Sequence, residues 1–159
     1  MYSRMVVGLD GSKLAEQILP HVEALAERFH STLVLVQAIT PPAAIMDPAT
    51  AAMVGPLAGP IVDPAAIAEA EVREATAYLE PVAARLRERG FAVDYVSRAG
   101  APAGVLLDVA RELGADLLAL TTHGRGGLGR LVFGSVADEV LRKAHCPVLL
   151  VRASGAEAV

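Results

Sequence analysis

The sequence predicts one α/β domain in which an open, doubly wound sheet of five mostly parallel strands is covered by helices on both faces. Three observations support this prediction. Short apolar runs alternate with segments of helical periodicity, and this alternation is typical of parallel sheets because each crossover places a helix on a face of the sheet. The chain has 159 residues, which suits a single core. Hydrophobic residues make up 53% of it, which argues against disorder.

The first part of the chain contains two predicted strands and a helix. Residues 4–9 and 32–39 are short and almost continuously apolar, as strands buried on both faces are. Between them, apolar residues recur in steps of three and four over 14–29, which gives one helical face. Ser12 can cap the start of this helix. Pro20 should kink or locally break it, because proline lacks the N–H that a helix interior requires.

A long proline-rich loop is predicted over residues 41–64. It holds six prolines and exceeds an ordinary connection in a compact domain, so it is typical of a lid or a disordered insertion. A long helix follows, with apolar residues in helical steps from 72 to 86. Pro81 should bend this helix. Gly90 is well placed to end it.

The second half of the chain continues the alternation. Three further strands are expected at 91–97, 116–120 and 147–151, with a helix between the first two that ends at Gly114. A glycine-rich loop, 121–133, then leads to a short helix that begins near Ser135, and the last strand is expected at a sheet edge. The domain is therefore expected to span 1–153, with a frayed tail at 154–159.

Composition narrows the functional classes. Fourteen basic side chains against eighteen acidic ones give a formal net charge of −4, which argues against a surface that binds nucleic acid phosphates. The single cysteine, Cys146, cannot form an intramolecular disulfide, as is usual in a reducing cytosol. We find no pattern of a signal peptide and no apolar run near the ~20 residues of a membrane span. A cytoplasmic protein without nucleic acid or membrane partners is expected.

The segment 121–136 carries the chemical information. It lies between a predicted strand and a predicted helix, where ligands bind in open parallel sheets. The free N–H groups of the helix that opens at Gly134-Ser135 favour a phosphate, and Arg125 and Arg130 supply positive charge. The residues alone also allow a structural interpretation, in which Ser135 caps its helix and the glycines form only a flexible loop.

The sequence does not contain the common motifs for phosphate binding, catalysis or zinc binding in the context that each of them requires. Residues 124–129 match G-x-G-x-x-G by letter, but they follow the fourth strand, and no acid stands in 144–152 to bind a ribose. No Walker A string is present. His123 lacks the partners of a catalytic base, and Cys146 with His145 cannot complete a four-ligand zinc site. We therefore predict no catalytic and no metal-ligating residue.

The two ends of the chain resemble the universal stress protein family. Gly124, nine further residues and Gly134-Ser135 resemble the second half of the G-x-x-G-x9-G-[ST] signature of its ATP-binding subgroup. Residues 6–12 (VVGLDGS) and 145–151 (HCPVLLV) are similar to its first and last strands. Thr121 stands where the signature has its first glycine. Its hydroxyl can contact a sugar, whereas its β-branch restricts the backbone.

The resemblance implies a fold, a ligand and an assembly. It implies an adenine nucleotide alpha hydrolase-like sheet with strand order 3-2-1-4-5 and a homodimer built around the last strand, 147–151. It implies ATP, with or without Mg²⁺, as the ligand. The implied contacts are Gly8, Leu9 and Asp10 beside the nucleoside, the Ala38 backbone at adenine, Thr121, Gly124 and Arg125 at the ribose and phosphates, and Gly134, Ser135 and Val136 at the phosphate tail.

Three functions remain open at this point. The first is an ATP-binding regulator of the stress response, the second is a slow ATPase, and the third is an interaction module that has an empty cleft or binds cAMP. Asp10 also has a structural interpretation, because Asp-Gly-Ser is a common turn and helix entry.

Overall fold

The computed structural model describes residues 1–40, 64–123 and 134–153. The predictions for 41–63, 124–133 and 154–159 lie outside these residues. The elements are β1 (Arg4–Gly8), the 3₁₀ helix η1 (Ala15–Ile18), α1 (Leu19–Phe29), β2 (Thr32–Ile39), α3 (Pro64–Glu88), β3 (Ala92–Ala99), α4 (Pro102–Glu112), β4 (Leu117–His123), α5 (Ser135–Lys143) and β5 (Val148–Ala153).

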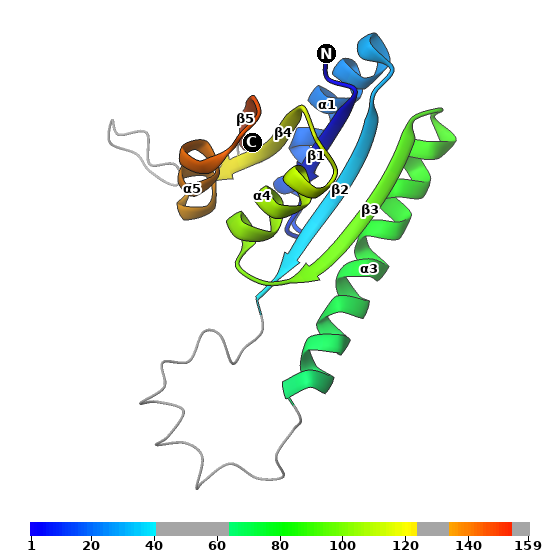
Figure 1. The fold of residues 1–159 in the computed structure, drawn as a ribbon. Coiled ribbons are helices and arrows are strands. Elements are labelled where there is room, and N and C mark those ends of the chain that lie inside the picture. Colours follow the sequence, from blue (N-terminus) through cyan, green and yellow to red (C-terminus); the bar gives the residue numbers. More distant parts are fainter. Residues whose placement is uncertain (41–63, 124–133, 154–159) are drawn as a thin grey trace, which may run out of the picture.

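The five strands form one parallel sheet of order β3-β2-β1-β4-β5 (Figure 1). This confirms the predicted fold class, the strand order and the edge position of the last strand. Several boundaries differ from the prediction: β3 ends at Ala99 and β5 at Ala153, each two residues later than expected, and Pro64 begins α3 instead of ending the loop. The difference that bears on the site is in β4. Residues 121–123 were placed in the glycine-rich loop, but they continue β4, because Thr121 pairs with Val151 and His123 with Ala153 of β5.

Proline acts on the two N-terminal helical segments as expected. The helical stretch over 14–29 is broken into η1 and α1, and Pro20 lies in the first turn of α1. A missing N–H costs nothing there, because the first N–H groups of a helix have no partner within the helix. The Ser12 hydroxyl accepts a hydrogen bond from the Ala15 N–H at 3.1 Å, as a cap does. In contrast, α3 continues through Pro81 as one helix of 25 residues.

Left-handed residues end the three longest helices. Gly90 ends α3 with φ +91°, and the Phe91 N–H reaches back to the Leu86 carbonyl at 3.2 Å. This is the Schellman arrangement, for which glycine is favoured because it has no Cβ. Gly114 ends α4 in the same way with φ +61°. His30 takes this position after α1 with φ +53°, which is unusual for a residue with a side chain.

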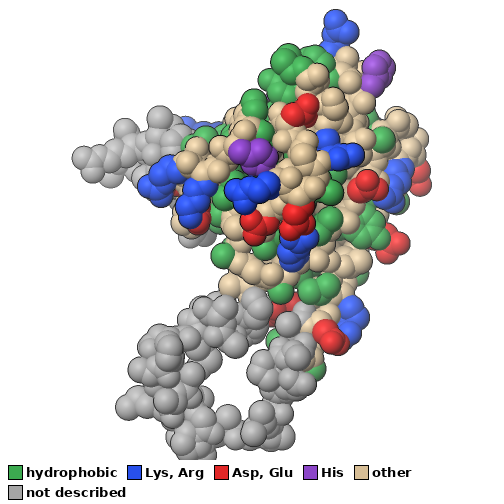
Figure 2. Space-filling view, in the orientation of Figure 1, with side chains coloured by type: hydrophobic (Ala, Val, Ile, Leu, Met, Phe, Trp, Pro, Cys, Tyr) green, Lys and Arg blue, Asp and Glu red, His purple; other side chains and the backbone are tan. Residues whose placement is uncertain are grey.

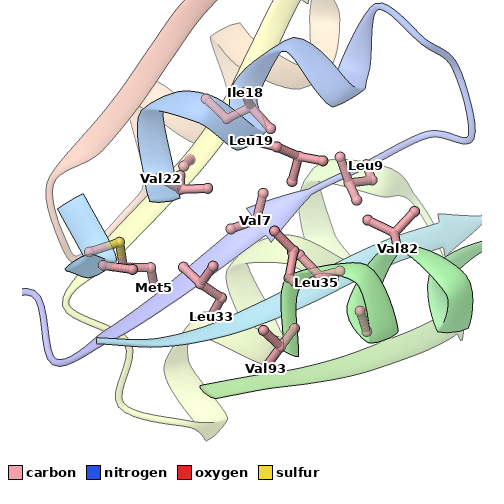
Figure 3. Close-up of a cluster of buried hydrophobic side chains, with 14 of the residues drawn as sticks. Met5, Val7, Leu9, Ile18, Leu19, Val22, Leu33, Leu35, Val82 and Val93 are labelled. Atoms are coloured by element: carbon pink, nitrogen blue, oxygen red, sulfur yellow. The ribbon is translucent and has the colours of Figure 1, made fainter. Parts of the chain in front are cut away.

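The sheet is apolar on both faces, which explains the continuous apolar runs in the sequence. On one face, Met5 and Val7 of β1 pack against α1 and α3 (Figure 3). On the other face, Val6 packs with α4 and α5. All three side chains are fully buried. Because successive side chains of a strand alternate between faces, five residues of β1 link both halves of the core.

Candidate functional site

The chain changes direction at the boundary between β1 and β4. From β1 it moves through η1 and α1 to β2 on one side, and after β3 it crosses back through α4 to β4 on the other side. Helices then diverge at the carboxyl ends of the two central strands, and such switch points are where open α/β sheets bind ligands.

A cavity of about 300 Å³ lies at this switch point, which is at the lower end of the range for small-molecule sites. It is bordered by both central strands, the end of β2 and the starts of α4 and α5. Its lining residues are Gly8, Leu9, Asp10, Ala15, Val36, Ala38, Pro102, Leu106, Leu120, Thr121 and Val136.

Six residues that the sequence analysis selected line this one cavity: Gly8, Leu9, Asp10, Ala38, Thr121 and Val136. Gly134 and Ser135 are exposed at the start of α5 and do not line it. Gly124 and Arg125 lie outside the described residues. The structure thus brings together residues that are far apart in the sequence, from Gly8 to Val136.

Gly8 allows α4 to approach the first strand. A Cβ built on Gly8 would lie 3.1 Å from both δ carbons of Leu106 and 3.5 Å from the Leu120 Cβ. Its backbone is extended within β1, where it pairs with Val36. Glycine is therefore needed here for space and not for an unusual backbone conformation.

Asp10 combines the two interpretations that the sequence left open. Its Oδ1 accepts a hydrogen bond from the Ser12 N–H at 2.9 Å, which stabilises the turn after β1. The same residue lines the cavity and is exposed. The turn therefore fixes Asp10 at the mouth of the cavity, and one role does not exclude the other.

The start of α5 shows that Ser135 does not cap this helix. Gly134 is the N-cap residue, with φ −57° and ψ 155°, and no side chain caps the helix. Ser135 is the first residue of the helix, so the expectation that it caps α5 is wrong. The first bond into the helix runs from the Asp138 N–H to the Gly134 carbonyl at 3.0 Å. The N–H groups of Ser135 and Val136 have no partner within the helix, and N–H groups in this position commonly bind anions.

The described lining of the cavity is mostly apolar. Asp10 is the only charged side chain among the described lining residues, and most of the wall is apolar, as in small-molecule sites that use few polar groups. Within the described ranges, no group of three His, Cys, Asp or Glu side chains is placed to hold a metal ion. Sequence reasoning missed Val36, Leu106 and Leu120, because an apolar cavity wall has the same pattern as an apolar core.

The surface around α4 and α5 carries mixed charge. Blue and red side chains are interspersed on the face seen in Figure 2. Several form ion pairs, such as Arg98 with Glu112 at 2.8 Å and Lys143 with Glu139 at 2.6 Å. Among the described helices, none combines the length and the apolar character needed to cross a membrane.

Comparisons with known proteins agree with this architecture. The model of the universal stress protein family matches residues 1–152. The universal stress protein MJ0531 of Methanocaldococcus jannaschii is 27% identical over 96% of this chain and 83% of its own length. The solved structure of MJ0577 from the same organism has a TM-score of 0.73 at 24% identity, covering 98% of this chain and 99% of its own.

A further solved structure is that of a universal stress protein in complex with cAMP. It is 25% identical, with a TM-score of 0.65, and the match covers 96% of this chain and 98% of the other. Both structures have the same overall fold over almost the full length of the two chains. Together with the family match, these similarities show that the chain belongs to the universal stress protein family.

Proposed function

We propose that this protein binds an adenine nucleotide, ATP, in the cavity between β1 and β4 and acts in the cytoplasm as a nucleotide-dependent regulator of the stress response. The observation that supports this most strongly is the convergence of six sequence-selected residues on one cavity at the switch point of the sheet. The position of the cavity supports nucleotide binding, and the family supports the regulatory role.

The end of β2 suits an adenine ring. β1 stops pairing with β2 at Leu9, whose N–H donates to the Val36 carbonyl at 2.9 Å, whereas β2 continues to Ile39. Residues two apart in a strand present their backbone groups to the same side. The N–H and C=O of Ala38 therefore face the space beyond the end of β1. A neighbouring donor and acceptor match the donor and acceptor of the Watson–Crick edge of adenine.

The remaining contacts follow from the walls of the cavity. Val36, Leu106 and Leu120 provide an apolar surface for the faces of the base. Asp10 and Thr121 line the cavity, and in our proposal Asp10 would accept hydrogen bonds from the ribose hydroxyls and Thr121 would donate one to them. The open N–H groups at the start of α5, with Ser135, would bind the phosphates. Gly124 and Arg125 complete this phosphate site in our proposal, and Mg²⁺ would accompany the triphosphate.

The ligand can be identified directly. Mass spectrometry of small molecules released from the purified native protein is expected to detect an adenine nucleotide, and release of a nicotinamide dinucleotide instead would contradict the proposal. Val136→Trp fills the cavity from α5 and should weaken ATP binding in calorimetry by about tenfold or more. Leu141→Trp is the matched control, because Leu141 lies on the same helix but is 43% exposed.

A second candidate ligand is cAMP. One relative with 25% identity was solved with cAMP, and the adenosine half is common to both nucleotides. Calorimetric titration of ATP and cAMP into the same preparation separates the two. Tighter binding of cAMP would replace ATP in the proposal. Single-turnover assays, with Gly124→Arg as the reference variant, would decide whether bound ATP is also hydrolysed.

We further propose a homodimer formed through β5. This strand pairs with β4 on one side only and lies at the edge of the sheet, and apolar edges tend to pair with another strand. The Leu118 N–H donates to the Pro147 carbonyl, so the N–H of Leu150, three residues on, faces away from β4. Leu150→Pro removes an outward donor and is expected to shift sedimentation velocity from dimer to monomer. A monomeric parent protein would refute the proposal.

A further inference from the structure

A second cavity, of about 490 Å³, lies beside the carboxyl end of β2 and under the first half of α3. In Figure 1 the first turns of α3 extend past the ends of β2 and β3, so this part of the helix has no strand directly beneath it. The lining residues are Asp10, Gly11, Gln37, Ala38, Ile39, Thr40, Glu71, Glu74, Ala75 and Tyr78. None of them is a lysine or an arginine.

One face of α3 provides half of this wall. Glu71, Glu74, Ala75 and Tyr78 follow one another in steps of three and four, which places them on a single side of the helix. The rotation of the helix is fixed by a hydrogen bond of 2.7 Å between the hydroxyls of Thr76 and Ser97 in β3. The face of α3 that carries the buried apolar residues Leu79 and Val82 over the sheet therefore carries Glu71 and Glu74 where the helix extends past the ends of the strands.

The inner end of the cavity holds polar atoms that lack partners. Gln37 Oε1, Glu71 Oε2 and the Tyr78 hydroxyl are buried, and none of them accepts a hydrogen bond from a described residue. Buried polar atoms are almost always hydrogen-bonded, because leaving them unpaired is unfavourable. The two oxygens are acceptors and the hydroxyl can accept as well. What they lack is a donor.

Two acids of the cavity, Glu71 and Glu74, also form no ion pair with a described cation. Glu16, nearby on η1, is paired with Lys13 at 3.0 Å and with Arg85 at 3.1 Å. In contrast, no ion pair between described residues involves Glu71 or Glu74. The local field is negative: burial, followed by the charges of Glu16 and Asp10, raises the pKa of Tyr78 to about 12.

We infer that this second cavity binds an aliphatic diamine or polyamine, a small organic cation with protonated amine groups. Each ammonium group offers three donors and no acceptor, which complements Glu71 and Gln37 inside the cavity and the exposed Glu74 at its mouth. The methylene groups of such a ligand would lie against Ala38, Ile39 and Ala75. A metal ion fits less well, because no group of three ligating side chains is placed for one within the described ranges.

The inference does not depend on nucleotide binding. Asp10 and Ala38 border both cavities, but the acceptors that lack donors, on Gln37, Glu71 and Tyr78, belong to the second one alone. Amine binding is therefore tested without added nucleotide. Its failure would leave the proposed nucleotide site unaffected, and failure of nucleotide binding would leave the amine site unaffected.

The test is calorimetric titration of putrescine and spermidine into the full chain at neutral pH and low salt. Saturable binding is expected. The double variant Glu71→Gln/Glu74→Gln should weaken it by about tenfold for each carboxylate removed, because charge-assisted hydrogen bonds are strong. Glu80→Gln is the matched control, since it removes one acid from an exposed position of the same helix and should keep the parental affinity.

Two further measurements keep the test decisive. Without amine, the double variant Glu71→Gln/Glu74→Gln should be at least as thermally stable as the parent, because it removes like charges. Tyr78→Phe should weaken spermidine binding while leaving the charge of the cavity unchanged. Three results would overturn the inference: no heat with either amine at millimolar concentration, equal weakening in Glu80→Gln, or carboxylate-dependent binding of Mg²⁺ or Ca²⁺ without binding of amines.

Discussion

Substituting Gly8 by alanine tests the geometry of the proposed nucleotide site. The new Cβ would lie 3.1 Å from both δ carbons of Leu106, whereas carbon atoms attract one another best at ~3.5–4.0 Å. The backbone of Gly8 has no positive φ, so alanine is tolerated by the main chain. The destabilising part of the effect of Gly8→Ala must therefore come from displacing Leu106 by a few tenths of an ångström.

The expected cost of Gly8→Ala differs between the protein without a ligand and the protein with a nucleotide bound. Overpacking a core costs ~1–3 kcal/mol, and replacing a glycine recovers ~0.4–1 kcal/mol through the unfolded state. Leu106 borders the cavity and can move into it, so the empty protein should lose at most about 2 kcal/mol, or roughly 4–8 °C in Tm. A bound nucleotide takes this space away. The affinity for ATP should therefore fall by about tenfold.

A double-mutant cycle distinguishes this mechanism from general damage. Leu106→Val shortens the opposing side chain, so Gly8→Ala should cost less in its background, with a coupling energy of ~0.5–2 kcal/mol. Gly104→Ala is the control on the same helix: its Cβ would meet nothing within 4 Å, so it should stabilise α4 by ~0.5–1 kcal/mol without changing affinity. Additive effects of Gly8→Ala and Leu106→Val, or parental ATP affinity in Gly8→Ala, would refute the reasoning.

Three further predictions concern stability and reactivity. Burial acts to raise the pKa of Asp116, but the backbone N–H groups of Ser3 (2.9 Å) and Arg4 (3.1 Å) donate to its carboxylate and hold the pKa below its usual value. The contribution of Asp116 to the free energy of unfolding is therefore present above pH ~3.9 and is lost as the pH falls through the folded pKa. Asp116→Asn should cost roughly 1 kcal/mol near neutral pH in urea unfolding and reduce this loss in acid; unchanged acid unfolding would contradict it. His30→Gly should raise stability by about 0.5–1 kcal/mol, because it removes a side chain from a left-handed position, and a lower Tm would argue otherwise. Burial, followed by the charge of Asp116, raises the pKa of the Cys146 thiol, so its alkylation should be slow in the native protein and fast in urea; equal rates would exclude this.

Most of the fold could be predicted from the sequence because its signals are local. Gly90 and Gly114 were expected to end helices, and both do so with a positive φ. The end of β4 could not be predicted in this way. Thr121 and His123 follow an apolar run and precede glycines, which indicates a loop, but their strand conformation comes from pairing with β5, about thirty residues further on.

The candidate sites could be predicted only where residue types are distinctive. Ser135 illustrates the limit, because serine is common both at the N-cap and in the first turn, and only the backbone angles of Gly134 show where α5 begins. The sequence contains one signal of the proposed amine site. Glu71 and Glu74 continue the helical phase of the apolar residues Ala75 and Leu79, and acids in phase with a core face indicate that the face lines a cavity.

Thr121 shows how the structure changes the meaning of a sequence departure. The universal stress protein signature has glycine at this position, and a β-branched residue would be costly if the backbone there needed a positive φ. Thr121 instead lies inside β4 and pairs with Val151, in the extended conformation that β-branched residues favour. The substitution therefore requires no strained backbone, and it adds a hydroxyl to the wall of the cavity. Because the cavity forms with threonine in place, glycine at this position is required neither by the strand nor for the cavity to exist.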